Sequence, residues 1–163
     1  MDLDPRLHFV AVTAIVAKDG PDGRLRFLIT KRAPNEKAFP GKWTVPGGKL
    51  VRTEYEHLPS TAPDYEQWYE VVEYVLRKEV REETGIEIEK PRYLTDLVFV
   101  RPDGYPVVTL SYWARYKSGE VKLNHEMTEF AWVTAAEAAK HDMIEGIPDE
   151  IAAVENTLKR GTV

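Results

Sequence analysis

Alternating apolar and polar residues mark two hairpins in this chain. Residues 8–18 are rich in β-branched apolar side chains, and residues 24–32 place leucine, phenylalanine and isoleucine at alternate positions. Two more apolar stretches, 93–101 and 107–117, stand on either side of a Pro-Asp-Gly turn, although only 24–32 has a clear period of two. Such a period is typical of strands. We therefore predict four long strands, and shorter apolar runs predict two more at 43–45 and 130–133.

One long stretch has the helical period instead. Residues 71–86 read VVEYVLRKEVREETGI, with apolar positions three or four residues apart. We expect Asp64 to cap this helix, which would begin between residues 64 and 68 and end at Gly85.

Two shorter helices are predicted near the carboxyl end of the chain. They cover 135–141, after Thr134, and 149–159, where Pro148 stands in the first turn. Strands, a central helix, more strands and terminal helices together predict an α+β fold. We expect an α/β/α sandwich with a mixed, mostly antiparallel sheet and helices on both faces.

Acidic side chains fall on the face of the long helix that should be apolar. If Val72 is the zero of a helical wheel, Glu79 lies at about −20° and Glu83 at about +20°, with Glu82 on the shoulder at about −80°. This is the stripe formed by the apolar residues of the helix, Val72, Val75, Leu76 and Val80. A buried carboxylate without a partner costs several kcal/mol. Three clustered acids therefore suggest a hard divalent cation such as Mg²⁺.

A solvated, charged helix face is the alternative interpretation of the same residues. Arg77, Lys78 and Arg81 would then pair with the acids at helical spacing. This alternative suits Arg77 and Arg81, which fall on the outer side of the wheel, but it accounts poorly for Glu79.

Composition narrows the class of protein. The 163 residues carry a net charge of −5, with 43% hydrophobic and 30% charged residues. We expect one globular domain over residues 1–163, no nucleic acid polymer as partner, and no membrane association, because no apolar run is long enough to span a bilayer. The chain has no cysteine and no signal-peptide pattern at its start, so a cytoplasmic location is expected.

The helix sequence also resembles a known motif. Gly48 followed by KEVREETGI at 78–86 resembles the Nudix box: Gly, five residues, Glu, seven residues, then Arg-Glu-aliphatic-x-Glu-Glu-x-Gly-aliphatic. The segments AFPGKWTVPGG, before the box, and EMTEFAWV at 126–133 are similar to flanking segments of family members. The resemblance implies a Nudix-like sandwich and a Nudix pyrophosphohydrolase, which cleaves a nucleoside diphosphate linked to another group.

Two departures from the box stand out. Lys78 takes the place of the box arginine, which keeps the charge but loses the bidentate fork. Lys78 also lies 30 positions after Gly48, where the box allows 14, so an insertion of 16 residues is expected near 52–67. Counting back from Lys78 makes Glu70 the first glutamate of the box, and Glu70 joins the site only if the helix starts after it.

The resemblance implies roles for individual residues. Glu79, Glu82 and Glu83 would hold Mg²⁺, with Mn²⁺ as an alternative, together with Glu126 from a later loop. The catalytic base would come from Glu82, Glu83 or Glu126, with Glu129 as a competing candidate. Substrate contacts are expected from Arg32, Gly47 and Gly48.

The substrate is less closely defined than the family. The default is a nucleoside triphosphate cleaved to the monophosphate and pyrophosphate. ADP-ribose or a nucleotide sugar is the alternative, because Pro102 stands 16 residues after Ile86, although its turn already explains a proline there. A non-catalytic nucleotide-binding module is a third hypothesis, raised by Lys78. A homodimer is left open.

Overall fold

The sheet is built around β1 (Phe9–Asp19). In the computed structural model, which describes residues 4–161, β1 pairs antiparallel with β2 (Leu25–Arg32) and β4 (Gly47–Lys49). On its other side β1 runs parallel to β7 (Pro106–Ser118) over nine residue pairs. The buried apolar residues of β1 explain this central place, since Val12 and all four residues from Ala14 to Ala17 are fully shielded from solvent.

The remaining strands extend the sheet at its two sides. β3 (Trp43–Thr44) and β8 (Met127–Val133) pair with β2, while β5 (Glu87–Ile88) and β6 (Arg92–Val100) pair with β7. All these pairings are antiparallel, so the predicted mixed, mostly antiparallel sheet is confirmed. β8 begins three residues before the predicted strand, and β5 was not predicted, because two residues are too few to show a period.

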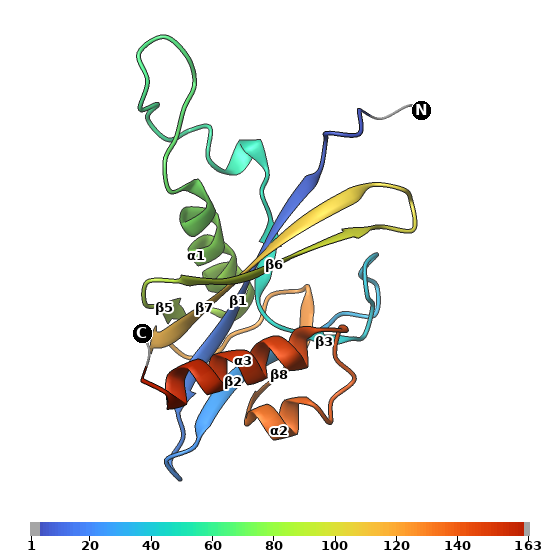
Figure 1. Cartoon of the computed structure of the whole chain (residues 1–163), viewed down its shortest axis with the longest axis vertical. Helices are drawn as coiled ribbons and strands as arrows, with labels where there is room; N and C mark the ends of the chain where they lie inside the picture. Colours follow the sequence, from blue (N-terminus) through green and yellow to red (C-terminus); the bar gives the residue numbers. More distant parts are fainter. Residues whose placement is uncertain (1–3, 162–163) are drawn as a thin grey trace.

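Helices cover both faces of the sheet (Figure 1). α1 (Val71–Thr84) packs its apolar residues on one face against Val12, Val16 and Leu28. α2 (Ala135–Ala138) and α3 (Ile147–Lys159) pack on the other face. The predicted α/β/α arrangement is therefore confirmed, although α2 ends three residues earlier than expected.

The start of α1 differs from the prediction. The helix begins at Val71, and its first flanking residue is Glu70, in the left-handed conformation with φ 59° and without a side-chain cap. The expectation that Asp64 caps the helix is therefore wrong. The chain has to turn sharply at Glu70 to bring Val71 and Val72 onto the sheet, and no local signal in the sequence marks that turn. The predicted end is confirmed, because Gly85 closes the helix with φ 74°.

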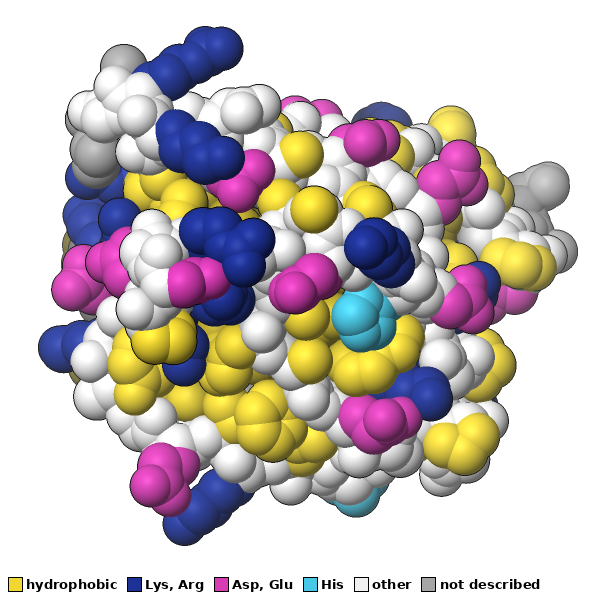
Figure 2. Space-filling view, turned by 90° about the horizontal axis from the view of Figure 1, so that it is seen from below, with side chains coloured by type: hydrophobic (Ala, Val, Ile, Leu, Met, Phe, Trp, Pro, Cys, Tyr) yellow, Lys and Arg dark blue, Asp and Glu magenta, His cyan; other side chains and the backbone are white. Residues whose placement is uncertain are grey.

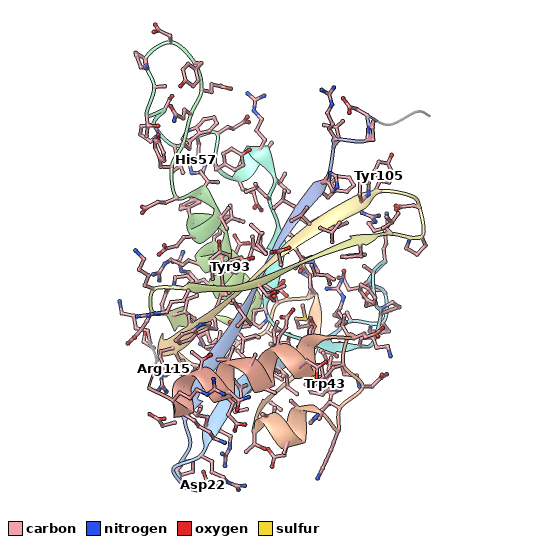
Figure 3. The ribbon with its side chains drawn as sticks, viewed as in Figure 1. Asp22, Trp43, His57, Tyr93, Tyr105 and Arg115 are labelled. Atoms are coloured by element: carbon pink, nitrogen blue, oxygen red, sulfur yellow. The ribbon has the colours of Figure 1, made fainter. Side chains whose placement is uncertain are left out.

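A short 3₁₀ helix, η1 (Arg52–Glu54), precedes α1 and is joined to it by residues 55–70. This connecting segment projects beyond the sheet (Figure 1). Its base is fixed by Trp68, whose Nε1–H donates to the Leu58 carbonyl at 2.8 Å and whose ring meets the Tyr55 ring edge-on at 5.3 Å between centroids. His57 lies at the same base, above the first turn of α1 (Figure 3).

Charges of both signs are interspersed with apolar side chains on the face that is seen from below (Figure 2). Among the described residues, no helix has the length and apolar character needed to cross a membrane.

Candidate metal and active site

Glu83 is the acid that the fold buries most deeply. Its side chain lies under the sheet edge, the residue is only 4% exposed, and its Oε2 accepts a hydrogen bond from the Gly47 N–H at 3.2 Å. Burial raises the pKa of Glu83 to about 8, against the lowering effect of the Gly47 hydrogen bond, and the nearby Glu126 and Glu79 carboxylates raise it further. Such a group holds a proton at neutral pH unless a cation replaces it.

Glu79 lies one turn earlier and packs directly on Gly48. A Cβ atom on Gly48 would be 2.5 Å from the Cδ of Glu79, so only glycine leaves room for this carboxylate. Burial raises the pKa of Glu79 to about 7, with a further rise from Glu54 and an opposing effect from Lys78. The wheel prediction that Glu79 and Glu83 point inward is confirmed by these contacts.

The two glycines belong to a strand. Gly47 and Gly48 lie in β4, opposite Thr13 and Val12 of β1. A Cβ on Gly47 would be 2.3 Å from the Val12 carbonyl oxygen, so Gly47 is required for strand pairing as well as for the contact with Glu83. The two glycines therefore let the backbone of β4 come close to the carboxylates of Glu79 and Glu83 on α1.

Glu54, at the end of η1, also lies beside these acids and was not among the predicted site residues. Lys78 Nζ lies 3.2 Å from Glu54 Oε1 and 2.9 Å from Glu82 Oε1, so one lysine joins both acids. Burial lowers the pKa of Lys78, but the hydrogen bonds to Glu82 and Glu54 outweigh burial and raise it overall. The second oxygen of Glu54, Oε2, is buried without a hydrogen-bond partner among the described residues.

The signal for Glu54 was present in the sequence. Five residues separate Gly48 from Glu54, which is the spacing of the first box glutamate, whereas counting back from Lys78 stays within α1 and stops at Glu70, the residue before the helix. Glu70 is exposed and flanks the helix start, although the helix does begin after it. We therefore interpret 55–70, rather than 52–67, as the inserted segment.

Glu126 reaches the same carboxylates from the loop before β8. Its backbone is held on two sides, because its carbonyl accepts from the Ala33 N–H at 2.8 Å and its N–H donates to Asn124 Oδ1 at 3.0 Å. Its charge contributes to the raised pKa of both Glu79 and Glu83. The competing candidate, Glu129, instead forms an exposed ion pair with Lys31 at 2.8 Å on β8.

Arg32 stands at the end of β2, beside this cluster. Its Nε donates to the Ala38 carbonyl at 2.7 Å and its Nη2 to Glu36 at 3.2 Å, so the loop that follows fixes its position. Its charge acts to lower the pKa of Glu83. The fold thus brings every predicted site residue into one neighbourhood, namely Arg32, Gly47, Gly48, Glu79, Glu82, Glu83 and Glu126.

These residues fit a divalent cation by their chemistry. Carboxylate oxygens are the ligands that Mg²⁺ prefers. The second oxygen of Glu54 has no hydrogen-bond partner among the described residues, and burial followed by the nearby carboxylates raises the pKa of Glu83. In the part of the chain that the structure describes, no three acidic or histidine side chains already form a ligand set. Lys78 explains part of this, because it draws Glu54 and Glu82 toward itself.

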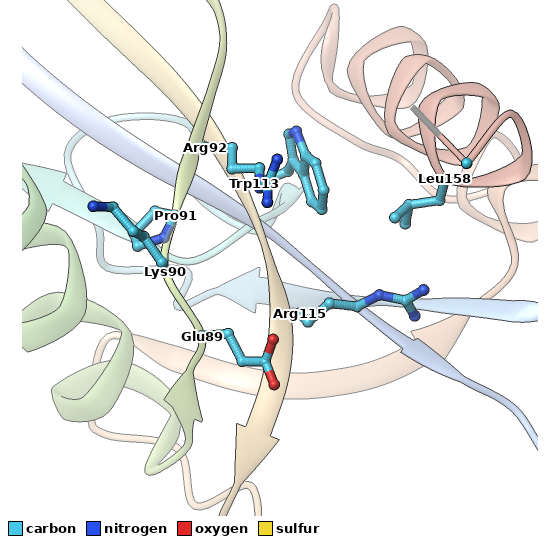
Figure 4. Close-up of a pocket in the computed structure, with 8 residues that line it drawn as sticks. Glu89, Lys90, Pro91, Arg92, Trp113, Arg115 and Leu158 are labelled. Carbon is cyan, nitrogen blue, oxygen red and sulfur yellow. The ribbon is translucent and has the colours of Figure 1, made fainter. Parts of the chain in front are cut away.

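A hollow of about 630 Å³ lies elsewhere, between β7 and the last turn of α3 (Figure 4). Trp113, Arg115 and Leu158 line it, and the Arg92 guanidinium lies 5.7 Å from the centre of the Trp113 ring. None of the clustered acids contributes to its lining. The candidate chemistry therefore belongs to the carboxylate cluster and not to this hollow.

Comparison with known proteins agrees with the geometry. The model of the NUDIX domain matches residues 7–153. The chain belongs to the NUDIX family. It is therefore a Nudix pyrophosphohydrolase, as the box residues predicted.

Relatives of this Nudix chain include nucleoside triphosphatase NudI of Escherichia coli (strain K12). The two are 25% identical over 142 residues, which cover 81% of this chain and 86% of NudI. NudI of Klebsiella pneumoniae (strain 342) is 26% identical over 127 residues, or 72% of this chain and 79% of that protein.

Solved structures share the fold at lower identity. The MutT protein of Methanosarcina mazei Go1 superposes with a TM-score of 0.67 at 22% identity, over 99% of this chain and 100% of that one. The NUDIX domain of Shewanella oneidensis NrtR, solved with ADP ribose, gives a TM-score of 0.72 at 17% identity, over 96% and 94% of the two chains.

Proposed function

We propose that this Nudix enzyme hydrolyses a nucleoside triphosphate to the nucleoside monophosphate and pyrophosphate, with Mg²⁺ or Mn²⁺ as cofactor. One observation carries the proposal. Glu79 and Glu83 are packed together against β4 with their pKa raised to about 7 and about 8. A fold keeps such a costly pair where a cation and a phosphate are to be bound.

The metal would be held by the carboxylates of Glu79, Glu82, Glu83 and Glu126. It would neutralise the negative charge of the phosphates and so favour attack by water. Gly47 and Gly48 leave room for these carboxylates, and Arg32 offers a positive charge to the phosphates from the end of β2. Water adds to one phosphorus as the bond from that phosphorus to the bridging oxygen breaks. A carboxylate from Glu82, Glu83 or Glu126 takes the proton that this water loses.

The NudI relatives support a triphosphate as substrate. They are nucleoside triphosphatases, and their alignments cover 81% and 72% of this chain. A second candidate is ADP-ribose or a nucleotide sugar. It is supported by the fold shared with the NrtR domain, which was solved with ADP ribose. Either substrate is a small nucleotide, and a chain without cysteine is suited to act on it in the cytoplasm.

A substrate panel with Mg²⁺ tests the proposal. Canonical and oxidised nucleoside triphosphates, ADP-ribose and nucleotide sugars are compared by chromatography of the products. A triphosphate gives the monophosphate and pyrophosphate, whereas ADP-ribose and a nucleotide sugar give a monophosphate and a sugar phosphate. Pyrophosphate from triphosphates alone supports the proposal, and turnover of ADP-ribose alone favours the second candidate. Turnover of none, combined with nucleotide binding by calorimetry, would leave the non-catalytic module as the function.

A matched pair of variants ties the activity to the site. Glu83→Gln removes the buried carboxylate with little change in volume, while Glu129→Gln changes an exposed acid that forms an ion pair with Lys31. Loss of turnover in Glu83→Gln with full activity in Glu129→Gln is the expected result. Equal activity in both would place the chemistry elsewhere.

A further inference from the structure

Glu150, in the first turn of α3, is a partly buried acid without a cationic partner. Its Oε1 accepts a hydrogen bond from the Ser111 hydroxyl at 3.2 Å, and it forms no ion pair with any described residue. Its Oε2 has no hydrogen-bond partner in the described part of the chain, yet it is not among the buried oxygens that lack one, which are those of Thr30 and Glu54. One carboxylate oxygen of Glu150 therefore reaches the surface and is free to accept a hydrogen bond from a ligand.

The fold turns Glu150 toward the sheet at a cost. Burial raises the pKa of this carboxyl, and the hydrogen bond from Ser111 lowers it only in part. The positive end of the helix dipole favours an acid in the first turn, but the neighbouring Asp149 meets that preference while it is exposed to solvent. The dipole therefore does not explain why Glu150 is partly buried, since taking a carboxylate out of water costs free energy.

Two hydroxyl groups hold this carboxylate in place. The Thr13 hydroxyl donates to Ser111 Oγ at 3.3 Å, and Ser111, which is 1% exposed, donates its own proton to Glu150. Because a hydroxyl has a single proton to donate, Ser111 holds Oε1 of Glu150 and leaves Oε2 as the open acceptor. Thr13 and Ser111 are paired residues of β1 and β7, so the carboxylate lies over the centre of the sheet.

The sheet continues beyond this carboxylate without α3 to cover it. α3 packs on Ile15 and Trp113, which lie further along β1 and β7. In the other direction the same face continues through Thr109, with Leu97 of β6 paired beside it, and neither residue belongs to the core under α3. Leu97 is 48% exposed, and Figure 1 shows these strands extending well beyond α3. A partly exposed, largely apolar floor therefore adjoins Glu150.

This floor lies within reach of the metal-site carboxylates. Thr13 pairs with Gly47 across β1 and β4, and the Gly47 N–H donates to Glu83 at 3.2 Å. Since paired Cα atoms are about 5 Å apart, this series of contacts joins Glu83 to Glu150 over roughly 15 Å or less. β4 pairs with no other described strand, so no further strand closes the sheet on that side of Gly47. A nucleotide with its phosphates at Glu83 can therefore place its base beside Glu150.

We propose that Glu150 recognises the exocyclic amino group of the substrate base, so that the enzyme prefers cytosine to uracil and adenine to hypoxanthine. The inference rests on the proposed function, because it takes the phosphates to bind at the carboxylate cluster. Oε2 of Glu150 accepts one N–H of the amino group, while the ring packs on the apolar floor beside Leu97. In uracil and hypoxanthine a carbonyl oxygen takes the place of the amino group, and it repels the carboxylate.

Two substrate pairs that differ in this group test the proposal: CTP with UTP, and ATP with ITP. Wild type should favour the amino member of a pair in kcat/KM by about ten- to hundredfold, which is the usual effect of a hydrogen bond to a charged group. Glu150→Gln should bring the ratio close to one, because its amide can donate to the carbonyl oxygen. The control Asp149→Asn, at the exposed acid beside it, should keep the wild-type ratio. Equal values within both pairs in wild type, or an unchanged ratio in Glu150→Gln, would overturn the proposal.

Binding of the monophosphates separates this proposal from the hydrolytic function. If no triphosphate is turned over, calorimetry with CMP, UMP, AMP and IMP measures the same preference as a ratio of dissociation constants. Tighter binding of the amino member, lost in Glu150→Gln, would support the role of Glu150 even though the proposed hydrolysis had failed. Equal or undetectable binding would overturn it, as would a uniform loss of affinity for all four in Glu150→Gln, which would place the carboxylate at the ribose. Thermal midpoints verify that both variants fold.

Discussion

Two adjacent glutamates show how surroundings decide what a carboxylate can do. Glu83 is 4% exposed and bonded to the Gly47 N–H, whereas the Glu82 side chain is 52% exposed and paired with Lys78 at 2.9 Å. Burial raises the pKa of Glu83, while the helix turns Glu82 outward to a lysine. The same residue type is thus buried against β4 at one position and half exposed beside a lysine at the next.

Glu82→Gln should lower turnover by about 100-fold or more, because the amide keeps the shape but loses the charge that a metal requires. The thermal midpoint should change by a few degrees at most, since Glu82 is half exposed. Steady-state kinetics with Mg²⁺ measures the effect, with Glu129→Gln as the control. Near wild-type turnover would remove Glu82 from the metal site.

Glu83 makes the metal-free protein sensitive to pH. Its pKa is about 8 in the folded chain and ordinarily 4.5, so the folded state binds the proton more tightly. Stability is therefore greatest below about pH 4.5 as far as this group is concerned, and it falls as pH rises toward 8. In EDTA at pH 8, Glu83→Gln should be more stable than wild type by on the order of a few kcal/mol.

Urea unfolding at pH 5 and pH 8 checks this sign. The stability difference between Glu83→Gln and wild type should grow with pH and be small at pH 5. A difference that is constant with pH would mean that Glu83 is not strained by its burial. Glu129→Gln, at an exposed ion pair, should show no such trend.

At the scale of elements, the spacing of apolar residues predicted most of the helices and strands that pack on one another in the structure. α1, the four long strands and α3 follow from their apolar patterns, and the inward acids of α1 follow from the wheel. The start of α1 did not follow, because the left-handed Glu70 is set by how Trp68 and Tyr55 dock the segment before it. Glu54 was missed because the box spacing was counted back from Lys78, where it reaches Glu70, and not forward from Gly48, where it reaches Glu54.

The segment 55–70 should behave as a locally stable unit held by Trp68. Trp68→Ala removes the bond to the Leu58 carbonyl and the contact with the Tyr55 ring. Hydrogen exchange should then accelerate within 55–70 while the amides of β1 and β7 keep their protection. Acceleration that spreads through the sheet would mean that this segment is part of the core. Tyr65→Ala, at a 67% exposed residue of the same segment, is the control.

The molecule as a whole has a negative net charge, and its candidate site is also acidic. If a chain of net charge −5 is to bind a nucleotide polyphosphate as proposed, repulsion between like charges has to be offset, and without a cation the α1 carboxylates would add to that repulsion. Metal binding to the folded state alone stabilises the molecule, by about 2.7 kcal/mol at 100 times the dissociation constant. For a chain of this length, that amounts to roughly 5–10 °C in the thermal midpoint.

Mg²⁺ should therefore raise the thermal midpoint of the wild type, and EDTA should reverse the rise. The shift should be larger at pH 8 than at pH 6, because Glu79 and Glu83 must lose protons to bind the cation and their pKa lies near 7 and 8. Differential scanning fluorimetry at the two pH values measures it, with Glu83→Gln expected to lose most of the shift. Na⁺ at matched ionic strength is the control for electrostatic screening by salt. Screening weakens interactions between surface charges, so its effect on the thermal midpoint should be the same in wild type and in Glu83→Gln. If Na⁺ reproduced the Mg²⁺ shift, or if Glu83→Gln kept it, the stabilisation would come from general charge screening rather than from a site built by α1 and β4.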